Sequence, residues 1–218
     1  PLNMASSMKK GSSISTGARK TPATTASAAA TPQAKASTPR VGMPSVWAAG
    51  RFSEVARMAK AFNMRVIGTK RRPEKVANVD EVFGASDSRK VIEQSDFLLL
   101  LLPATPETDN FVNAERLSWM KPTAWLLNFG RGHLIKDDDL IAAVKGKKVA
   151  GAVLDVFRQE PLPSEHPFWG TENIIVLPHI GGPHPQRDRF VAKLFVENLG
   201  LFLDGKPLKS LVDKQAGY

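Results

Sequence analysis

Arg131, Asp155, Glu160 and His179 each follow a short apolar stretch, and their types suit acid–base chemistry on a small anion. An imidazole beside a carboxylate can exchange a proton near pH 7, because the carboxylate orients the ring and raises its pKa. An arginine beside them can bind a carboxylate through two parallel hydrogen bonds. These residue types describe a site that reduces a 2-oxo acid: Arg131 binds the acid, His179 protonates the forming alkoxide and Glu160 tunes His179.

Each of these side chains also has an ordinary interpretation. A single arginine after a strand is commonly a surface charge, and a single histidine in a turn rich in proline and glycine is commonly a solvated loop residue. What favours a functional site is that all four positions lie at or just beyond the carboxyl ends of stretches that we predict to be strands of one sheet.

Apolar stretches of strand length alternate with helical patterns from about residue 53 onward. We predict strands at residues 64–68, 97–102, 124–129, 149–156 and 174–177, and helices at 55–62, 87–94, 113–120, 137–144 and 191–202. This alternation is typical of an α/β fold, here a Rossmann-like doubly wound parallel sheet with helices on both faces. Ligands of such sheets bind beyond the carboxyl ends of the strands, where the four side chains fall.

The composition excludes several classes of protein. The longest apolar run covers only residues 97–102, far short of the roughly 20 residues that span a bilayer, so we predict no membrane segment. The absence of cysteine excludes disulfides and thiolate chemistry. The four histidines lack the spacing of metal ligands, and we predict no metal site.

The formal net charge of +9 is concentrated at the N-terminus. Residues 1–50 contain six basic and no acidic side chains, which leaves 24 basic against 21 acidic residues, or +3, for residues 51–218. A charge of this size is ordinary for a folded domain, and no recognised nucleic-acid-binding motif accompanies it. We therefore predict no nucleic-acid partner.

Residues 1–46 are rich in Ala, Ser, Thr, Pro and Lys and contain almost no large apolar side chain. Such a segment buries too little surface to offset the entropy of ordering it, so we predict a disordered tail. Three origins fit this composition: a flexible tail, an out-of-frame segment, or an organellar transit peptide over residues 4–40. A transit peptide would direct the protein to a plastid or mitochondrion, and otherwise we expect the cytoplasm.

Several spaced motifs match one known family. They are SDF at residues 95–97, LPATPET at 102–108, MKP at 120–122, NFGRG at 128–132, LDVFRQEP at 154–161 and PHIGG at 178–182. In this order they resemble the NAD(P)-binding domain of the D-isomer-specific 2-hydroxyacid dehydrogenases, in particular the glyoxylate/hydroxypyruvate reductase branch. The resemblance extends from about Glu54 to the C-terminus.

The resemblance implies roles for individual residues. Arg131, Glu160 and His179 match the family's catalytic residues, and Asp155 matches the residue that holds the nicotinamide carboxamide. The cofactor is implied to lie along Pro103, Thr108, Phe129, Gly130 and Gly181. The implied substrate is a small 2-oxo or 2-hydroxy acid such as glyoxylate or hydroxypyruvate. Relatives dimerise through the cofactor domain, so a homodimer is implied as well.

The sequence departs from the family in its phosphate-binding loop. The family has G-x-G-x-x-G there, whose glycines allow a tight turn and close packing of the following helix. Residues 46–53 read VWAAGRFS, in which Gly50 is either the remaining loop glycine or simply a glycine that starts a helix. Pro44 falls where the central first strand is expected, and proline is poorly tolerated there. We therefore predict weakened or lost cofactor binding.

The resemblance also implies a separate substrate lobe before the cofactor domain, which we expect this chain to lack. We divide the chain into a tail (residues 1–46), a cofactor domain (47–200) and a C-terminal segment (201–218) that packs on that lobe in relatives. Without the lobe, apolar residues of this segment have no predicted cover, which favours association. The site is also less shielded from water, which is expected to lower its rate.

Two basic residues indicate which cofactor is preferred. Domains that prefer NAD place an acidic residue after the second strand to hold the ribose hydroxyls, but here Thr69 is followed by Lys70 and Arg71. These cations suit the 2′-phosphate of NADP, which we favour over NAD. Their alternative role is that of ordinary surface charges on a loop.

Three functional hypotheses remain open. The chain is an NAD(P)H-dependent reductase of small 2-oxo acids whose activity is impaired by truncation, a dinucleotide-binding regulatory module without turnover, or an incomplete gene product. The intact Arg131, Glu160 and His179 favour the first hypothesis, whereas the altered glycine loop favours the others.

Overall fold

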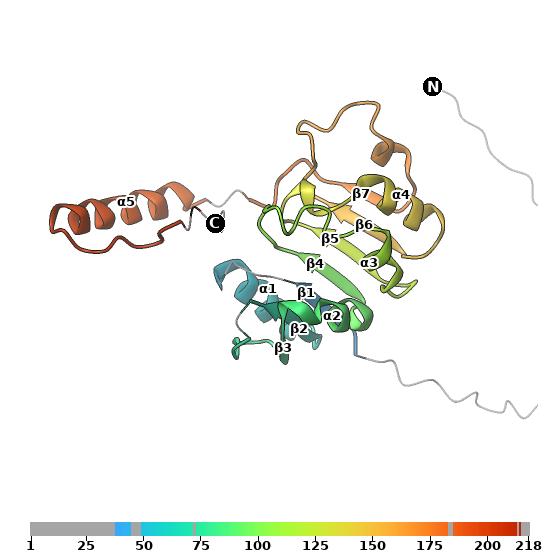
Figure 1. Cartoon of the computed structure of the whole chain (residues 1–218), viewed down its shortest axis with the longest axis horizontal. Helices are drawn as coiled ribbons and strands as arrows, with labels where there is room; N and C mark the ends of the chain where they lie inside the picture. The colour runs from blue at the N-terminus through green and yellow to red at the C-terminus, as the bar shows by residue number, and fades with distance from the viewer. Residues whose placement is uncertain (1–37, 45–48, 72, 183–184, 213, 215–218) are drawn as a thin grey trace, which may run out of the picture. The chain divides into compact units, whose positions relative to one another are not determined.

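The computed structural model describes residues 38–44, 49–71, 73–182, 185–212 and 214 (Figure 1). The chain divides into two compact units, Pro1–Ala36 and Ser37–Tyr218, of which only the second contains described residues. Residues 1–37 of the predicted disordered tail therefore lie outside the described residues, and for them the disorder stays a prediction.

Among the described residues, seven parallel strands form one sheet (Figure 1). They are β1 (Arg40–Pro44), β2 (Arg65–Lys70), β3 (Glu81–Gly84), β4 (Phe97–Leu100), β5 (Trp125–Asn128), β6 (Gly151–Leu154) and β7 (Ile174–Val176). Their order is β3-β2-β1-β4-β5-β6-β7, so β1 and β4 lie side by side where the direction of strand addition reverses. The predicted Rossmann-like fold is confirmed, and ligands of such sheets bind beside this reversal.

The strand β1 corrects the predicted extent of the tail, because residues 40–44 lie within its range. Pro44 is the last residue of this strand, although the sequence argued against a central strand at that position. Pairing with β4 covers Val41 and Gly42, while Pro44 is aligned with Thr69 of β2. Pro44 thus lies beyond the β4 ladder, at a strand end where a missing N–H is tolerated.

Strand β3 has no counterpart among the predicted strands. It is a short strand at the edge of the sheet, and its residues are exposed or half-buried, so no continuous apolar run marks it. The other five strands begin and end within two residues of the predicted positions. Apolar runs such as that of β7, which is also an edge strand, are therefore visible in the sequence, whereas β3 lacks such a run.

Helices cover both faces of the sheet. They are α1 (Ala49–Ala61), α2 (Ser88–Gln94), α3 (Ala114–Ser118), α4 (Asp137–Lys145) and α5 (Arg187–Leu203), with 3-10 turns η1 (Ala85–Asp87), η2 (Gly132–Leu134) and η3 (Pro167–Gly170). Leu98 and Leu100 pack in one core with α2, α3 and α4, whereas Leu99 packs with Ala56 and Ala59 of α1 in a second core. This burial on both faces explains the continuous apolar run of β4.

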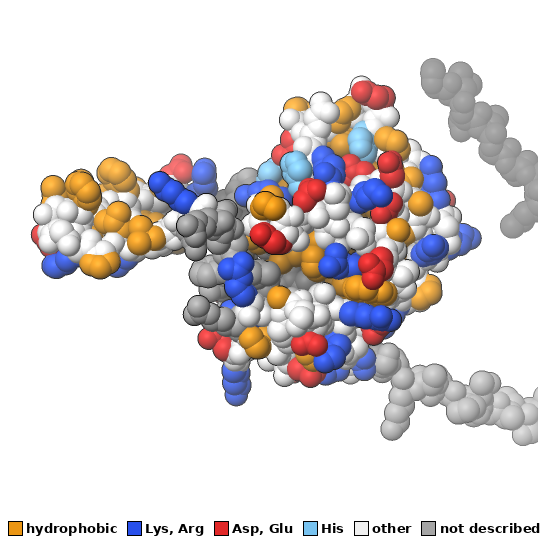
Figure 2. Space-filling model, viewed as in Figure 1, with side chains coloured by type: hydrophobic (Ala, Val, Ile, Leu, Met, Phe, Trp, Pro, Cys, Tyr) orange, Lys and Arg blue, Asp and Glu red, His pale blue; other side chains and the backbone are white. Residues whose placement is uncertain are grey.

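Helix α5 differs from the other helices, since none of its residues, all of which the structure describes, is buried. The apolar residues that predicted it include Phe195, Leu199 and Phe202, which are exposed by 65%, 46% and 70%. Figure 2 shows hydrophobic side chains exposed along the helix that Figure 1 labels α5. Among the described residues, no helix is long and apolar enough to cross a membrane.

Candidate active site

The loops after β4, β5, β6 and β7 leave adjacent strands at their carboxyl ends and so share one edge of the sheet. Arg131 lies in the loop after β5, Asp155 and Glu160 lie in the loop after β6, and His179 lies in the loop after β7. The structure therefore brings the four ionisable residues singled out in the sequence to the same edge.

Asn128, the last residue of β5, holds the backbone at Arg131. The Asn128 amide nitrogen donates to the Arg131 carbonyl at 3.0 Å, and the Asn128 side-chain oxygen accepts the Gly130 N–H at 3.1 Å. Asn128 is fully buried, so both bonds are shielded from water. The Arg131 side chain is exposed, and its Nη1 donates to the Gly130 carbonyl at 2.8 Å. A guanidinium carries several N–H donors, so this bond leaves donors for an anionic ligand.

His179 and Glu160 form a hydrogen-bonded pair in which Nδ1 of His179 lies 2.7 Å from Oε2 of Glu160. The other carboxylate oxygen, Oε1, accepts the Phe157 N–H at 2.9 Å. Partial burial raises the pKa of Glu160. The hydrogen bonds from Phe157 and His179 and the nearby charge of Arg131 together lower it by more than burial raises it, so this pKa lies below its usual value. Glu160 is therefore ionised at neutral pH, and Nε2 of His179 is the ring nitrogen left to meet a ligand.

Asp155 is 2% exposed and holds the loop that carries His179. Its Oδ1 accepts the Ile180 N–H at 2.7 Å, and its Oδ2 accepts the Gly181 N–H at 2.9 Å. The adjacent His179 has a φ of +54°, a conformation uncommon outside glycine, and these two bonds hold it there. The predicted contact between Asp155 and a nicotinamide carboxamide stays a prediction. Each carboxylate oxygen of Asp155 can accept a further hydrogen bond in addition to the one from the backbone.

Two glycines let the loops of this edge approach each other closely. A Cβ on Gly132 would lie 1.9 Å from the carbonyl carbon of Phe157, so the loops after β5 and β6 touch through their backbones. A Cβ on Gly181 would lie 2.7 Å from the ring of Phe129 and 2.9 Å from the carboxylate of Asp155. Gly132, Gly181 and Phe129, all from the motifs noted in the sequence, therefore pack the site together.

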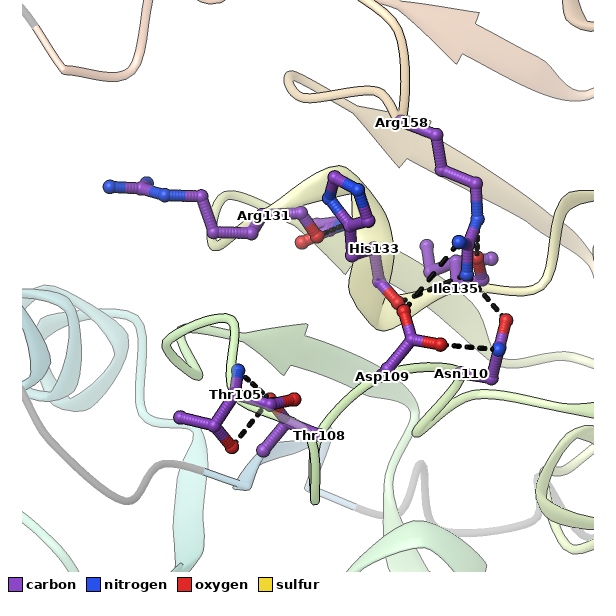
Figure 3. Close-up of polar contacts among 9 residues, drawn as sticks. Thr105, Thr108, Asp109, Asn110, Arg131, His133, Ile135 and Arg158 are labelled. Carbon is purple, nitrogen blue, oxygen red and sulfur yellow. Dashed lines mark hydrogen bonds and ion pairs between the residues drawn. The ribbon is translucent and has the colours of Figure 1, made fainter. Parts of the chain in front are cut away.

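A pocket of about 240 Å³ opens at the carboxyl ends of β2 and β4. Its lining includes Thr69 and Arg71 on one side and Pro103, Thr105 and Thr108 on the other. The Thr108 hydroxyl donates to the Pro103 carbonyl at 2.7 Å and accepts the Thr105 N–H at 2.8 Å, which closes a tight turn (Figure 3). Hydroxyl groups and a cation at the strand ends fit the ribose and phosphate of a dinucleotide.

The two predicted phosphate-binding cations differ in their surroundings. Arg71 lines the pocket, whereas Lys70, the last residue of β2, forms an ion pair with Glu74. Gly50 lies in the first turn of α1. Residues 45–48, which begin the altered glycine loop, lie outside the described residues, so the predicted weakening of cofactor binding stays a prediction.

Sequence reasoning did not single out Asn128 or Arg158. A buried asparagine at a strand end is a usable signal, because a buried amide needs hydrogen-bond partners. Arg158 gives no such signal, since its partners come from two other loops. Among the described residues, no cluster of three or more histidine and acidic side chains forms a metal site, and the predicted absence of a metal stays a prediction.

The family described as D-isomer specific 2-hydroxyacid dehydrogenase, NAD binding domain, matches residues 12–181 of this chain. The chain belongs to this family. The match begins inside the segment that we predicted to be a tail, in agreement with the presence of β1 there.

Curated relatives match a similar part of the chain. The glyoxylate reductase of Pyrococcus furiosus is 38% identical over 167 residues, which are 76% of this chain and 49% of the relative. The glyoxylate/hydroxypyruvate reductase B of Shigella boydii serotype 4 is 38% identical over 154 residues, which are 70% of this chain and 47% of the relative. The chain thus spans about half the length of the curated relatives it matches.

Solved structures show the same likeness. A D-isomer specific 2-hydroxyacid dehydrogenase from Xanthobacter autotrophicus Py2, in complex with NADPH and MES, is 32% identical with a TM-score of 0.75, over 83% of this chain and 73% of that chain. The NADPH-dependent glyoxylate/hydroxypyruvate reductase of Sinorhizobium meliloti, in complex with NADP and sulfate, is 31% identical with a TM-score of 0.74, over 83% of this chain and 57% of that chain.

Proposed function

We propose that this chain is the cofactor-binding part of an NADPH-dependent reductase that converts small 2-oxo acids, such as glyoxylate or hydroxypyruvate, to 2-hydroxy acids. The observation that carries the proposal is the 2.7 Å hydrogen bond between His179 and Glu160, at the sheet edge that also bears Arg131. Relatives named glyoxylate reductase and NADPH-dependent glyoxylate/hydroxypyruvate reductase support the substrate and the cofactor.

Each residue of the site has one task in this reaction. Arg131 binds the substrate carboxylate through paired charged hydrogen bonds. His179 donates a proton to the carbonyl oxygen, and Glu160, which holds Nδ1, orients the ring and stabilises its charged form. When bound, the reduced nicotinamide supplies the hydride that the carbonyl carbon accepts. Because the pKa of Glu160 is lowered, its carboxylate stays ionised while the imidazole exchanges protons.

NADPH is the cofactor that we propose, in preference to NADH. Arg71 lines the pocket after β2 and is assigned to the 2′-phosphate, and Lys70 joins it by exchanging Glu74 for the phosphate. Asp155 and the backbone at Gly181 are assigned to the nicotinamide end. The remaining cofactor contacts are assigned to Gly50, Pro103, Thr108, Phe129 and Gly130.

Calorimetry on the chain tests the proposal directly. NADPH is expected to bind about tenfold more tightly than NADH, and oxamate, an unreactive analogue of a 2-oxo acid, is expected to bind only after NADPH. Arg131→Ala is expected to remove oxamate binding and leave NADPH binding unchanged. Arg65→Ala is the matched control. Arg65 is the first residue of β2, at the end of the strand away from the candidate site, and its side chain forms an ion pair with Glu81. Equal oxamate affinities of Arg131→Ala and the unchanged chain would contradict the proposed role of Arg131.

A dinucleotide-binding regulatory module is the second candidate, favoured by the single glycine, Gly50, in the altered loop. Oxidation of NADPH with glyoxylate or hydroxypyruvate separates the two functions. A reductase consumes NADPH with at least one of the acids, and Arg131→Ala does not. A regulatory module shows no turnover and no oxamate binding, while NADPH still raises its melting temperature.

A further inference from the structure

Arg158 follows β6 and contacts the loops after the two preceding strands (Figure 3). Its Nε donates to the Ile135 carbonyl at 3.0 Å, and its Nη2 donates to the His133 carbonyl at 3.1 Å. Nη2 also donates to the side-chain oxygen of Asn110, and Nη1 lies 3.6 Å from the Asp109 carboxylate. One side chain therefore joins the loops after β4, β5 and β6.

The loops after β4 and β5 also meet through their backbones. The Asn110 N–H donates to the His133 carbonyl at 2.9 Å, and the Val112 N–H donates to the Leu134 carbonyl at 2.8 Å. The carbonyl of His133 thus accepts bonds from both Asn110 and Arg158. The guanidinium binds where the two loops join, and it ties that junction to the loop after β6.

The turn that Arg158 holds is the one that carries Arg131. Asn128 binds the Arg131 carbonyl on the strand side, and Arg158 binds the carbonyls of His133 and Ile135 on the far side of the same turn. Figure 3 shows the guanidinium of Arg131 pointing away from Arg158. Any effect of Arg158 on Arg131 therefore passes through the backbone of the turn.

The segment that carries Arg158 also carries Glu160, two residues further on. Glu160 in turn holds His179 at 2.7 Å. Gly132, inside the turn after β5, lies against the backbone of Phe157, the residue before Arg158. Arg158 thus links the loop that carries Arg131 to its own loop, which carries Glu160 of the acid–base pair.

We propose that Arg158 is a positioning residue that sets the spacing between Arg131 and the Glu160–His179 pair. The ligand in this inference, a 2-oxo acid, rests on the proposed function. A substrate held by its carboxylate must present its carbonyl oxygen to His179, and a displacement of about 1 Å between such groups can lower a rate by about 100-fold. The fork of a guanidinium can bind several carbonyl groups at once, which a lysine ammonium cannot do with the same geometry.

Hydrogen exchange tests whether Arg158 holds the turn. The amides of Leu134 and Ile135 are bonded within it, to the carbonyls of Arg131 and Gly132. Arg158→Met keeps the unbranched stem of the side chain and removes its donors, and we expect these amides to exchange about tenfold faster in this variant. Arg158→Lys is expected to be intermediate, and it replaces the Met variant if that variant does not fold.

Arg65→Met is the matched control, since the Arg65 side chain is 36% exposed against 31% for Arg158 and pairs with Glu81 at 2.8 Å. Exchange at Leu134 and Ile135 is expected to stay unchanged in this control. Unchanged exchange in Arg158→Met would overturn the inference, whatever the chain binds.

Ligand binding tests whether the turn matters for the site. We expect oxamate to bind the NADPH-loaded Arg158→Met chain about tenfold more weakly, while the dissociation constant of NADPH changes by less than about twofold. Equal weakening of both ligands would indicate a merely structural role and would overturn the positioning role. If the unchanged chain binds NADPH but no oxamate, the proposed function fails, and the exchange measurement still decides whether Arg158 holds the turn.

Discussion

The environments of Asp155 and Glu160 assign different tasks to two carboxylates of one loop. Asp155 is 2% exposed, and each of its oxygens accepts a backbone N–H of the neighbouring loop. Glu160 is partly exposed and shares its oxygens between the backbone at Phe157 and the ring of His179. Asp155 therefore holds the geometry of the site, while Glu160 stands where it can act on a proton.

Gly132→Ala tests the close contact between the loops after β5 and β6. The added methyl group would lie 1.9 Å from the carbonyl carbon of Phe157, so the two backbones must separate. We expect a loss of about 1–3 kcal/mol in the free energy of unfolding, measured in urea, together with weaker oxamate binding. Gly170→Ala is the control, because a Cβ there meets nothing within 4 Å. Equal stabilities of the two variants would show that the loop contact is dispensable.

At the scale of the secondary-structure elements, Asp96 joins the starts of three strands. Its carboxylate accepts the Arg40 N–H of β1 at 2.8 Å and the Lys121 ammonium, from the segment before β5, at 2.6 Å. Its backbone carbonyl accepts the Trp125 N–H of β5 at 2.9 Å. The carboxylate thereby holds β1 beside β4 at the edge opposite the candidate site.

Asp96→Asn is expected to destabilise the sheet in a pH-dependent way. Burial raises the pKa of Asp96, but the hydrogen bonds from Lys121 and Arg40 lower it by more than burial raises it. The pKa of Asp96 therefore lies below the usual value. A lowered pKa in the folded state stabilises the fold above the pKa of the unfolded chain, and this stabilisation is lost as the pH falls through the lowered pKa. We expect a loss of about 1–2 kcal/mol at pH 7 that shrinks below about pH 4.

Urea unfolding at pH 7 and at pH 3 measures this difference. Asp188→Asn is a suitable control, because the Asp188 side chain is 99% exposed on α5. A difference between Asp96→Asn and the unchanged chain that is as large at pH 3 as at pH 7 would rule out the carboxylate as its source.

At the scale of the whole molecule, the exposed apolar surface of α5 is the main unusual feature. Phe195 and Phe202 are exposed by 65% and 70%, and Leu211 and Val212 beyond the helix by 71% and 66%. The segment after the helix turns back along it, since the Lys209 N–H donates to the side-chain oxygen of Asn198 at 2.8 Å. Exposed apolar surface of this kind favours association in water.

We therefore expect the chain to associate in a concentration-dependent way through α5. The double change of Phe195→Lys and Phe202→Lys is expected to weaken this association by about tenfold or more, as measured by sedimentation velocity. Phe62→Lys, directly after α1, where the side chain is 75% exposed, is the control. A dimer that persists in the double variant would instead support the homodimer through the cofactor domain that the family resemblance implied.

Much of the fold could be predicted because burial leaves a pattern along the chain. The run at residues 97–102 marks a strand buried on both faces, and its centre, Leu98 to Leu100, is buried as expected. The same reasoning missed β1, since Pro44 and Gly42 interrupt its apolar pattern, and β3, whose residues are half-buried at the edge. Met58 and Phe62, apolar residues at helical spacing in the predicted helix over residues 55–62, are exposed by 55% and 75%, because the small residues Ala56 and Ala59 make the contact with the core.

The sequence by itself determined the family, the parallel sheet and the edge at which Arg131, Glu160 and His179 lie. Apolar stretches, helical patterns and motifs follow one another along the chain, and this succession can be read without the structure. Only the tertiary structure decided that Asp155 binds the loop of His179 and that Arg158, 48 residues from Asn110, ties three loops together. Hydrogen bonds form only when donor and acceptor come within about 3 Å. Which loops approach that closely depends on the packing of the whole sheet, and no local pattern of residue types records it.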